Sequence, residues 1–66
     1  MNERLKELRV ERKLSQRQVA EHLGISTRAY SHYEIGDREP SVSLLIKLCD
    51  LYDVTADYLI GRTDGY

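Results

Sequence analysis

Hydrophobic residues recur at intervals of three and four along most of this chain, which is the spacing that one face of an α-helix requires. Leu5 and Leu8 open the pattern near the N-terminus, and it becomes broadest between residues 44 and 51. The apolar side chains of that second stretch are Leu44, Leu45, Leu48, Cys49 and Leu51. This periodicity predicts helices, and local start and stop signals predict where each one begins and ends.

Three helix starts share one device, a hydroxyl side chain that can cap the helix and is flanked by hydrophobic residues that can pack together. The capping residues are Ser15, Ser26 and Thr55, and the helices they begin are predicted over residues 16–23, 27–35 and 56–60. A glycine follows each of these helices, as is typical of helix C-termini. Gln18 completes the pattern of a reciprocal capping box with Ser15.

Two more helices complete the prediction. Asn2 can cap a first helix that reaches about Lys13, and the Pro-Ser pair ending at Ser41 opens a fourth helix that carries the broad apolar face. The connections are short, and neither a repeat nor a linker separates two domains. The sequence therefore predicts a single all-α domain of five helices, with a core over about residues 2–61 and a fraying tail at residues 62–66.

Composition narrows the function. The chain has 66 residues, of which 41% are hydrophobic and 32% charged, so a small folded domain is expected rather than a disordered chain or an enzyme with an elaborate cleft. Its single cysteine, Cys49, cannot form an internal disulfide. The charged N-terminus lacks an apolar signal segment, and no run approaches the roughly 20 apolar residues of a membrane span. We therefore expect a cytoplasmic protein with no membrane function.

The charge distribution is uneven although the formal net charge is only −1. Residues 1–38 hold eight basic and six acidic residues, whereas residues 39–66 hold two basic and five acidic ones. An asymmetry of this size can arise by chance in a short chain. It is also what a protein with one face attractive to polyanions would show.

Two short helices joined by a glycine-containing turn are the helix-turn-helix pattern, and residues 15–35 fit it with Leu23-Gly24-Ile25 as the turn. At about 100° per residue, the second helix turns one compact arc of mostly polar side chains away from Tyr30 and Tyr33. The polar members of that arc are Thr27, Arg28, Ser31 and His32. Any amphipathic surface helix has a polar face, so the helix-turn-helix context is what favours a nucleic-acid contact.

The chemistry of this arc suits the base edges of the DNA major groove. Arg28 can donate two hydrogen bonds to guanine, Thr27 and Ser31 can donate or accept, and His32 can do either according to its tautomer. At the start of the preceding helix, Ser15 and Gln16 offer N–H groups to a phosphate. Two arginines, Arg17 and Arg38, can contact flanking phosphates, although solvated surface arginines are the commoner case.

Several motifs, weak singly, resemble in their order and spacing those of the Cro and lambda-repressor-like, or XRE, family. They are Leu14-Ser15-Gln16, Leu23-Gly24-Ile25-Ser26, Tyr33-Glu34-Ile35-Gly36, Arg38-Glu39-Pro40-Ser41 and Asp57-Tyr58-Leu59-Ile60-Gly61. The resemblance covers nearly the whole chain. It implies a lambda-repressor-like five-helix domain that regulates transcription, as a repressor, and whose third helix enters the major groove of double-stranded DNA. It also implies a homodimer on a palindromic operator.

The resemblance implies roles for individual residues as well. Gln16 matches the family's phosphate-contacting residue, the four polar residues of the arc match its base-facing positions, and Arg9 pairs with Glu34 in a structural salt bridge. We expect the dimer interface in the last two helices, at Leu51, Tyr52, Tyr58 and Ile60. The chain departs from the family pattern at Tyr30, His32 and Ile35, which leaves the operator sequence open.

Other classes of function have less support. His22 and His32 lie on separate helices, and no reactive cluster, metal-binding motif, cofactor motif or small-molecule site is evident, so no enzyme is predicted. Cys49 is expected to be a buried small hydrophobe rather than a reactive thiolate. A protein-interaction module, such as an antitoxin, is the stronger alternative. Exposed Arg28 and the short stretch after Gly61 favour direct DNA binding instead.

Overall fold

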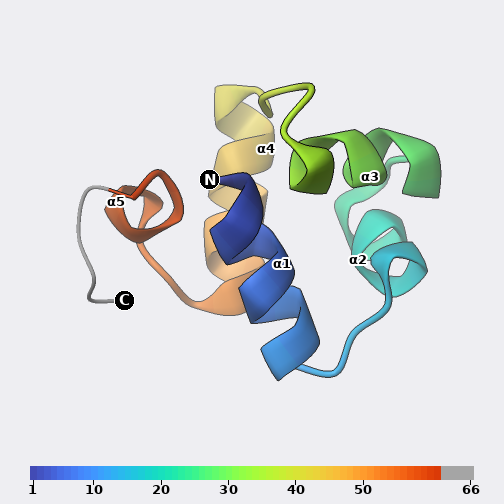
Figure 1. Cartoon of the computed structure of the whole chain (residues 1–66), viewed down its shortest axis with the longest axis horizontal. Helices are drawn as coiled ribbons and strands as arrows, with labels where there is room; N and C mark the ends of the chain where they lie inside the picture. The colour runs from blue at the N-terminus through green and yellow to red at the C-terminus, as the bar shows by residue number, and fades with distance from the viewer. Residues whose placement is uncertain (62–66) are drawn as a thin grey trace.

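The structure is a computed structural model that describes residues 1–61, and it contains five α-helices and no strand in that range (Figure 1). The helices are α1 Asn2–Glu11, α2 Gln16–Leu23, α3 Thr27–Ile35, α4 Val42–Tyr52 and α5 Ala56–Leu59. The all-α, five-helix prediction is therefore confirmed. The predicted fraying tail, residues 62–66, lies outside the described residues.

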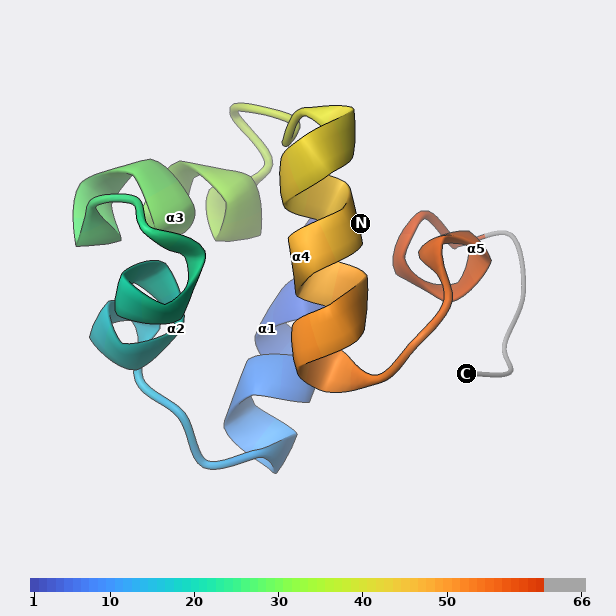
Figure 2. The same cartoon turned by 180° about the vertical axis from the view of Figure 1, so that it is seen from behind.

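The helices form a central pair with elements on both sides. In Figure 1, α1 lies in front of α4, while α2 and α3 lie on one side of this pair and α5 on the other. Figure 2, the view from behind, shows the same arrangement with left and right exchanged and with α4 in front. α3 packs on both α1 and α2, and α4 contacts α2 and α5. The helix-turn-helix unit, α2 and α3, thus lies on one side of the molecule, where α3 packs on α1 and α2 contacts α4.

One hydrophobic core joins all five helices. Its buried side chains are Leu5, Leu8, Val19, Ala20, Leu23, Tyr30, Leu44, Leu48, Tyr52, Val54 and Leu59. Two of them carry hydroxyl groups, and these hydroxyls lie 3.4 Å apart and share one hydrogen bond, so neither polar end is left unsatisfied inside the protein. Burial raises the pKa of both tyrosines, which therefore stay neutral.

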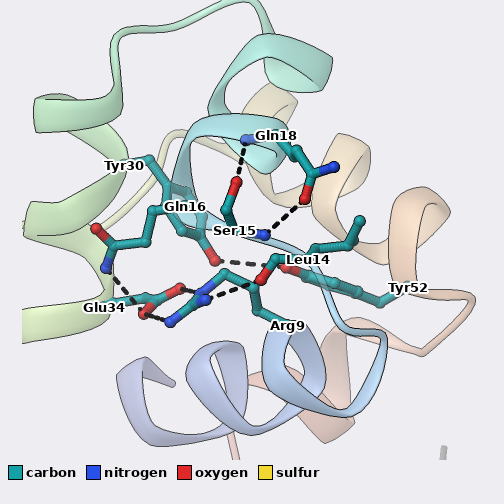
Figure 3. A network of polar contacts seen from close by, with 8 residues as sticks. All are labelled: Arg9, Leu14, Ser15, Gln16, Gln18, Tyr30, Glu34 and Tyr52. Carbon is teal, nitrogen blue, oxygen red and sulfur yellow. Dashed lines mark hydrogen bonds and ion pairs between the residues drawn. The ribbon is translucent and has the colours of Figure 1, made fainter.

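The predicted caps are confirmed as hydrogen bonds. The Ser15 hydroxyl accepts from the N–H of Gln18 at 3.0 Å, and the Gln18 side chain accepts from the N–H of Ser15 at 2.8 Å (Figure 3). Ser26 caps α3 and Thr55 caps α5 through equivalent contacts of 3.1 Å each. These bonds satisfy N–H groups that a helix end leaves free, and they set the direction in which α2 and α3 leave the turns.

The first helix differs from the prediction at both ends. Asn2 is not its cap: α1 begins at Asn2, and Met1 occupies the capping position without a side-chain bond. The helix ends at Glu11, because Lys13 takes a positive φ of 59° and the chain turns away there. Asn2 instead lies against Gly36 at the end of α3, where an added Cβ would come within 3.2 Å of the Asn2 Cγ.

Candidate nucleic-acid interface

α3 is defined at both ends and anchored along one side. It begins at the Ser26 cap and ends at Gly36, which adopts a left-handed conformation with φ 97° that suits glycine. Tyr30 is fully buried beneath the helix, and Glu34, one turn later, is 8% exposed. Since the inner face is fixed in this way, the outer face of α3 is held in one orientation relative to the rest of the protein.

The predicted polar arc occupies this outer face. Thr27 and Arg28 are exposed at the N-terminal end of α3, whereas Ser31 and His32 are half-buried further along. Ile35 extends the same face and is 61% exposed. None of the four predicted base-facing side chains is buried in the core. The two exposed members of the polar arc are therefore the ones at the start of the helix.

Two arginines flank an open hollow beside this arc. The hollow is lined by Ser26, Arg28, Ala29, His32 and Arg38, so residues of α3 and of the loop after it meet there. Arg28 and Arg38 are both exposed. Neither forms an ion pair with any residue between 1 and 61. Their guanidinium groups are thus available to an anionic ligand such as a phosphate or to the acceptor atoms of a base.

The other predicted phosphate contacts are already engaged within the protein. The Ser15 hydroxyl caps α2, and the Gln16 amide donates a hydrogen bond to Glu34 at 3.2 Å. A primary amide has two N–H donors, so Gln16 keeps one for an external acceptor. Arg17 lies 3.1 Å from Glu21, but their side chains are 80% and 66% exposed, so this pair is weak and can open in favour of a phosphate.

The Arg9 and Glu34 side chains form the strongest polar contact of the site. Arg9 donates from Nε at 2.6 Å and from Nη2 at 3.2 Å to the two carboxylate oxygens of Glu34, and from Nη1 to the carbonyl of Leu14 at 2.9 Å (Figure 3). The side chains are only 14% and 4% exposed. The two-pronged geometry suits a guanidinium facing a carboxylate, and it ties α3 to α1.

The charge state of Glu34 reflects these contacts. Burial by itself raises the pKa of Glu34, but hydrogen bonding from Arg9, Tyr30 and Gln16 together with the positive charge of Arg9 outweighs it, and the pKa lies below its ordinary value. Glu34 is therefore ionised at neutral pH, and its negative charge holds α1, α2 and α3 together at one point.

Two other arginines, Arg4 in α1 and Arg12 directly after it, also donate hydrogen bonds within the protein. Arg4 donates to the carbonyl of Tyr58 at 2.8 Å and lies 4.4 Å from the centre of the Tyr58 ring. Arg12 donates to the carbonyl of Tyr52 at 2.6 Å. Together with Arg9, these residues account for three of the eight basic residues in the first 38 positions. The basic surplus inferred from the sequence is therefore partly structural rather than a surface for polyanions.

The prediction that Tyr52 lies in the dimer interface is wrong. Tyr52 is fully buried and its hydroxyl hydrogen-bonds to that of Tyr30, so its side chain cannot meet a second copy. The spacing of apolar residues along α4 does not show whether each of them faces the core of its own chain or a second copy. Leu51 and Tyr58 are half-buried against the core, and Ile60 is 44% exposed.

Asp37 is a site residue that the sequence analysis missed. Its carboxylate oxygen Oδ2 lies 3.3 Å from Nδ1 of His32, a predicted base-facing residue. The signal was available in the sequence, because Asp37 follows the glycine that ends α3, and a left-handed glycine turns the next residue back over the last helical turn.

Residues 1–61 meet neither the requirements of a metal site nor those of a membrane-spanning helix. Up to Gly61, no group of three or more His, Cys, Asp or Glu side chains is placed to hold a metal ion. The longest helix in that range has 11 residues, and none there is long and apolar enough to cross a membrane.

Known proteins resemble this chain in sequence. A family model described as helix-turn-helix matches residues 5–59. The HTH-type transcriptional regulator YobD of Bacillus subtilis (strain 168) is 42% identical over 62 residues, which are 94% of this chain and 55% of YobD. AnsR, an HTH-type transcriptional regulator of the same organism, is 45% identical over 60 residues, or 91% of this chain and 52% of AnsR. The chain spans about half the length of these relatives.

A solved structure resembles it in fold. The P22 c2 repressor in complex with synthetic operator 9T matches with a TM-score of 0.83 and 29% sequence identity, covering 88% of each chain. The family model spans most of the residues that the structure describes. The chain therefore belongs to the XRE-type family, the Cro and lambda-repressor-like helix-turn-helix domains.

Proposed function

We propose that this chain binds double-stranded DNA in a sequence-specific way and regulates transcription as a repressor, with α3 lying in the major groove. The observation that carries the proposal is the exposed N-terminal end of α3, where Thr27 and Arg28 project from a helix that Tyr30 and Glu34 fix from behind. In helix-turn-helix proteins, this end of the second helix contacts base edges. The matching P22 c2 repressor was solved with an operator, which supports the same use here.

In this arrangement, bases and phosphates are contacted by different residues. Arg28 donates to the O6 and N7 acceptors of a guanine, while Thr27 and Ser31 contact neighbouring base edges. Arg38, Arg17, the second amide N–H of Gln16 and the Ser15 end of α2 contact flanking phosphates, which position the domain without reading sequence. With few free cations available, we expect log K to fall with log salt by about 0.9 for each phosphate neutralised, and the number of phosphates to be small.

We further propose that a homodimer binds a palindromic operator in the cytoplasm. Two recognition helices would then enter successive major grooves about 34 Å apart. Leu51, Tyr58 and Ile60 remain the candidate interface residues, since all three reach the surface at least in part. Doubling the contacts compensates for the small area that one domain of this size can offer to DNA.

Selection of bound duplexes from a random pool, followed by fluorescence anisotropy with the enriched sequence, tests the proposal. The wild-type protein should enrich one sequence, and Arg28→Ala should weaken its binding. Lys47→Ala is the matched control, because it removes one exposed cation from α4 instead of α3. An unenriched pool would overturn the proposal and favour a protein-interaction module or antitoxin. Equal losses from the two variants would overturn the role given to Arg28.

A further inference from the structure

His32 and Asp37 are brought together by the backbone at the C-terminal end of α3. The N–H groups of Gly36 and Asp37 both donate to the carbonyl of His32, at 3.0 Å and 3.2 Å. With Gly36 in a left-handed conformation, the bond from Asp37 is that of a Schellman motif, which places the residue after the glycine beside the residue five positions earlier. A hydrophobic contact often joins these two positions, but here they hold an imidazole and a carboxylate.

The chemistry of this contact determines where the imidazole proton lies. Nδ1 of His32 is 3.3 Å from Oδ2 of Asp37, and an ionised carboxylate can only accept hydrogen bonds. Nδ1 must therefore carry the proton that makes this bond. A neutral imidazole has only one N–H, so Nε2, the other ring nitrogen, is left as an acceptor.

We propose that Asp37 makes His32 an acceptor that selects a base carrying an amino group in the major groove, which is cytosine or adenine. Cytosine N4 and adenine N6 are the donors on the floor of that groove, whereas guanine and thymine present acceptors at O6, N7 and O4. Asp37 itself does not touch DNA and is a positioning residue. This inference rests on the proposed function, since it assigns a base preference to one position of the same site.

Arg28 and His32 recognise different bases only if His32 is an acceptor. Arg28 lies one turn earlier on the same helix, and both side chains line the hollow beside α3. A guanidinium has only donors, so Arg28 suits guanine. His32 with the opposite tautomer would also be a donor at Nε2 and would compete for the same kind of base edge. With Asp37 in place, the two side chains recognise different bases.

Nuclear magnetic resonance can observe the tautomer in the free protein. Long-range ¹H–¹⁵N correlation spectra at about pH 8, where imidazoles are neutral, should show the proton of His32 on Nδ1. His22, which is exposed at the end of α2, serves as an internal reference. Asp37→Asn should move His32 toward the pattern of His22, because an amide can donate as well as accept. The same pattern for both histidines in the wild-type protein would overturn the proposal.

Base preference is the second readout. Affinities for the four base pairs at each position of the selected duplex should show one position where cytosine or adenine is favoured about fivefold, the effect of a single hydrogen bond. Asp37→Asn should abolish that preference, but Asp57→Asn, an exposed carboxylate on α5, should leave it intact. In a His32→Ala background, Asp37→Asn should change no base preference.

These measurements separate this inference from the proposed function. Removing the charge of Asp37 can strengthen binding to all DNA equally, and comparing four base pairs at one position cancels that effect. If Asp37→Asn changes the affinity for all four base pairs by the same factor, the inference is overturned, while sequence-specific binding by the protein still stands. If the wild-type protein enriches no duplex, the proposed function fails and the base reading fails with it, whereas the spectra still decide whether Asp37 sets the tautomer.

Discussion

Glu34, near the end of α3, receives hydrogen bonds from both Nε and Nη2 of Arg9 on α1, so the recognition helix is tied to a helix outside the helix-turn-helix unit. Because both side chains are almost buried, Glu34→Ala would leave the guanidinium without its partner in the protein interior. We expect the free energy of unfolding to fall by about 3 to 5 kcal/mol. Urea denaturation followed by circular dichroism measures this loss.

A surface ion pair supplies the control for that experiment. Arg17 and Glu21 are four residues apart on α2, and both are mostly exposed. We expect Glu21→Ala to lower the free energy of unfolding by no more than about 0.5 kcal/mol. A loss for Glu34→Ala as small as that of the control would show that the contact between α1 and α3 adds little to stability.

The same carboxylate makes stability depend on pH in acid. The pKa of Glu34 in the folded protein lies below its ordinary value, so its contribution is complete above the unfolded pKa of about 4.3. The contribution is lost as the pH falls through the lower pKa of the folded state. We expect the unfolding free energy of the wild-type protein to decline more steeply below about pH 4.3 than that of Glu34→Gln. Parallel curves would contradict this assignment.

Two glycines that end helices allow a matched comparison. Gly24 and Gly36 both have positive φ, at 75° and 97°, but a Cβ at Gly24 would meet nothing within 4 Å, whereas one at Gly36 would press on Asn2. We expect Gly24→Ala to cost about 1 kcal/mol from the backbone alone and Gly36→Ala to cost more. Thermal unfolding should rank them in that order, and adding Asn2→Ala should reduce only the second loss.

Base and phosphate contacts should respond differently to truncation. We expect Arg28→Ala to cost about 1 to 3 kcal/mol on the selected duplex and to relax the preference at the base pair it contacts. Gln16→Ala should weaken binding to all duplexes by a similar factor, because a phosphate contact carries no sequence information. Anisotropy titrations against the selected duplex and its single-base variants make this comparison. Equal losses on every duplex for Arg28→Ala would refute its role as a base contact.

The dimer proposal can be tested at the exposed end of α5. Ile60 is 44% exposed, so Ile60→Glu should leave the stability of the monomer nearly unchanged while placing a charge in the interface. Analytical ultracentrifugation at micromolar protein should show a dimer for the wild type and a smaller species for the variant. A wild-type protein that sediments only at 7.7 kDa without DNA, and that binds the selected duplex as a single copy, would rule out the dimer.

Local features of the sequence were sufficient to predict most of the fold. The caps Ser15, Ser26 and Thr55 determine helix starts through bonds to residues three positions away, and such short-range geometry can be inferred without knowledge of the tertiary structure. Asn2 is not the cap because α1 already includes it, and its side chain lies against Gly36, which is distant in sequence. No capping rule contains that information.

The site was less predictable, because several of its contacts depend on which helices meet. Helical periodicity placed Thr27 and Arg28 on the outer face of α3, and that placement needed only the position of Tyr30 on the opposite side. The expectation of a dimer interface in the last two helices included Tyr52, because an apolar residue of α4 can belong either to the core or to an interface, and the structure places Tyr52 in the core. The charge count likewise could not show that Arg4 and Arg12 donate to carbonyl groups far along the chain.

The bond from Arg4 to the carbonyl of Tyr58 joins residues 54 positions apart, and this separation affects how the protein is made. During translation the first helix leaves the ribosome early, but its partner in the last helix follows only when synthesis of these residues is almost complete. Until then, the Arg4 guanidinium lacks the carbonyl and the ring of Tyr58, which it contacts in the native domain. A nascent chain that stalls before residue 56 therefore cannot form this link between the first and last helices, and it cannot complete the native domain.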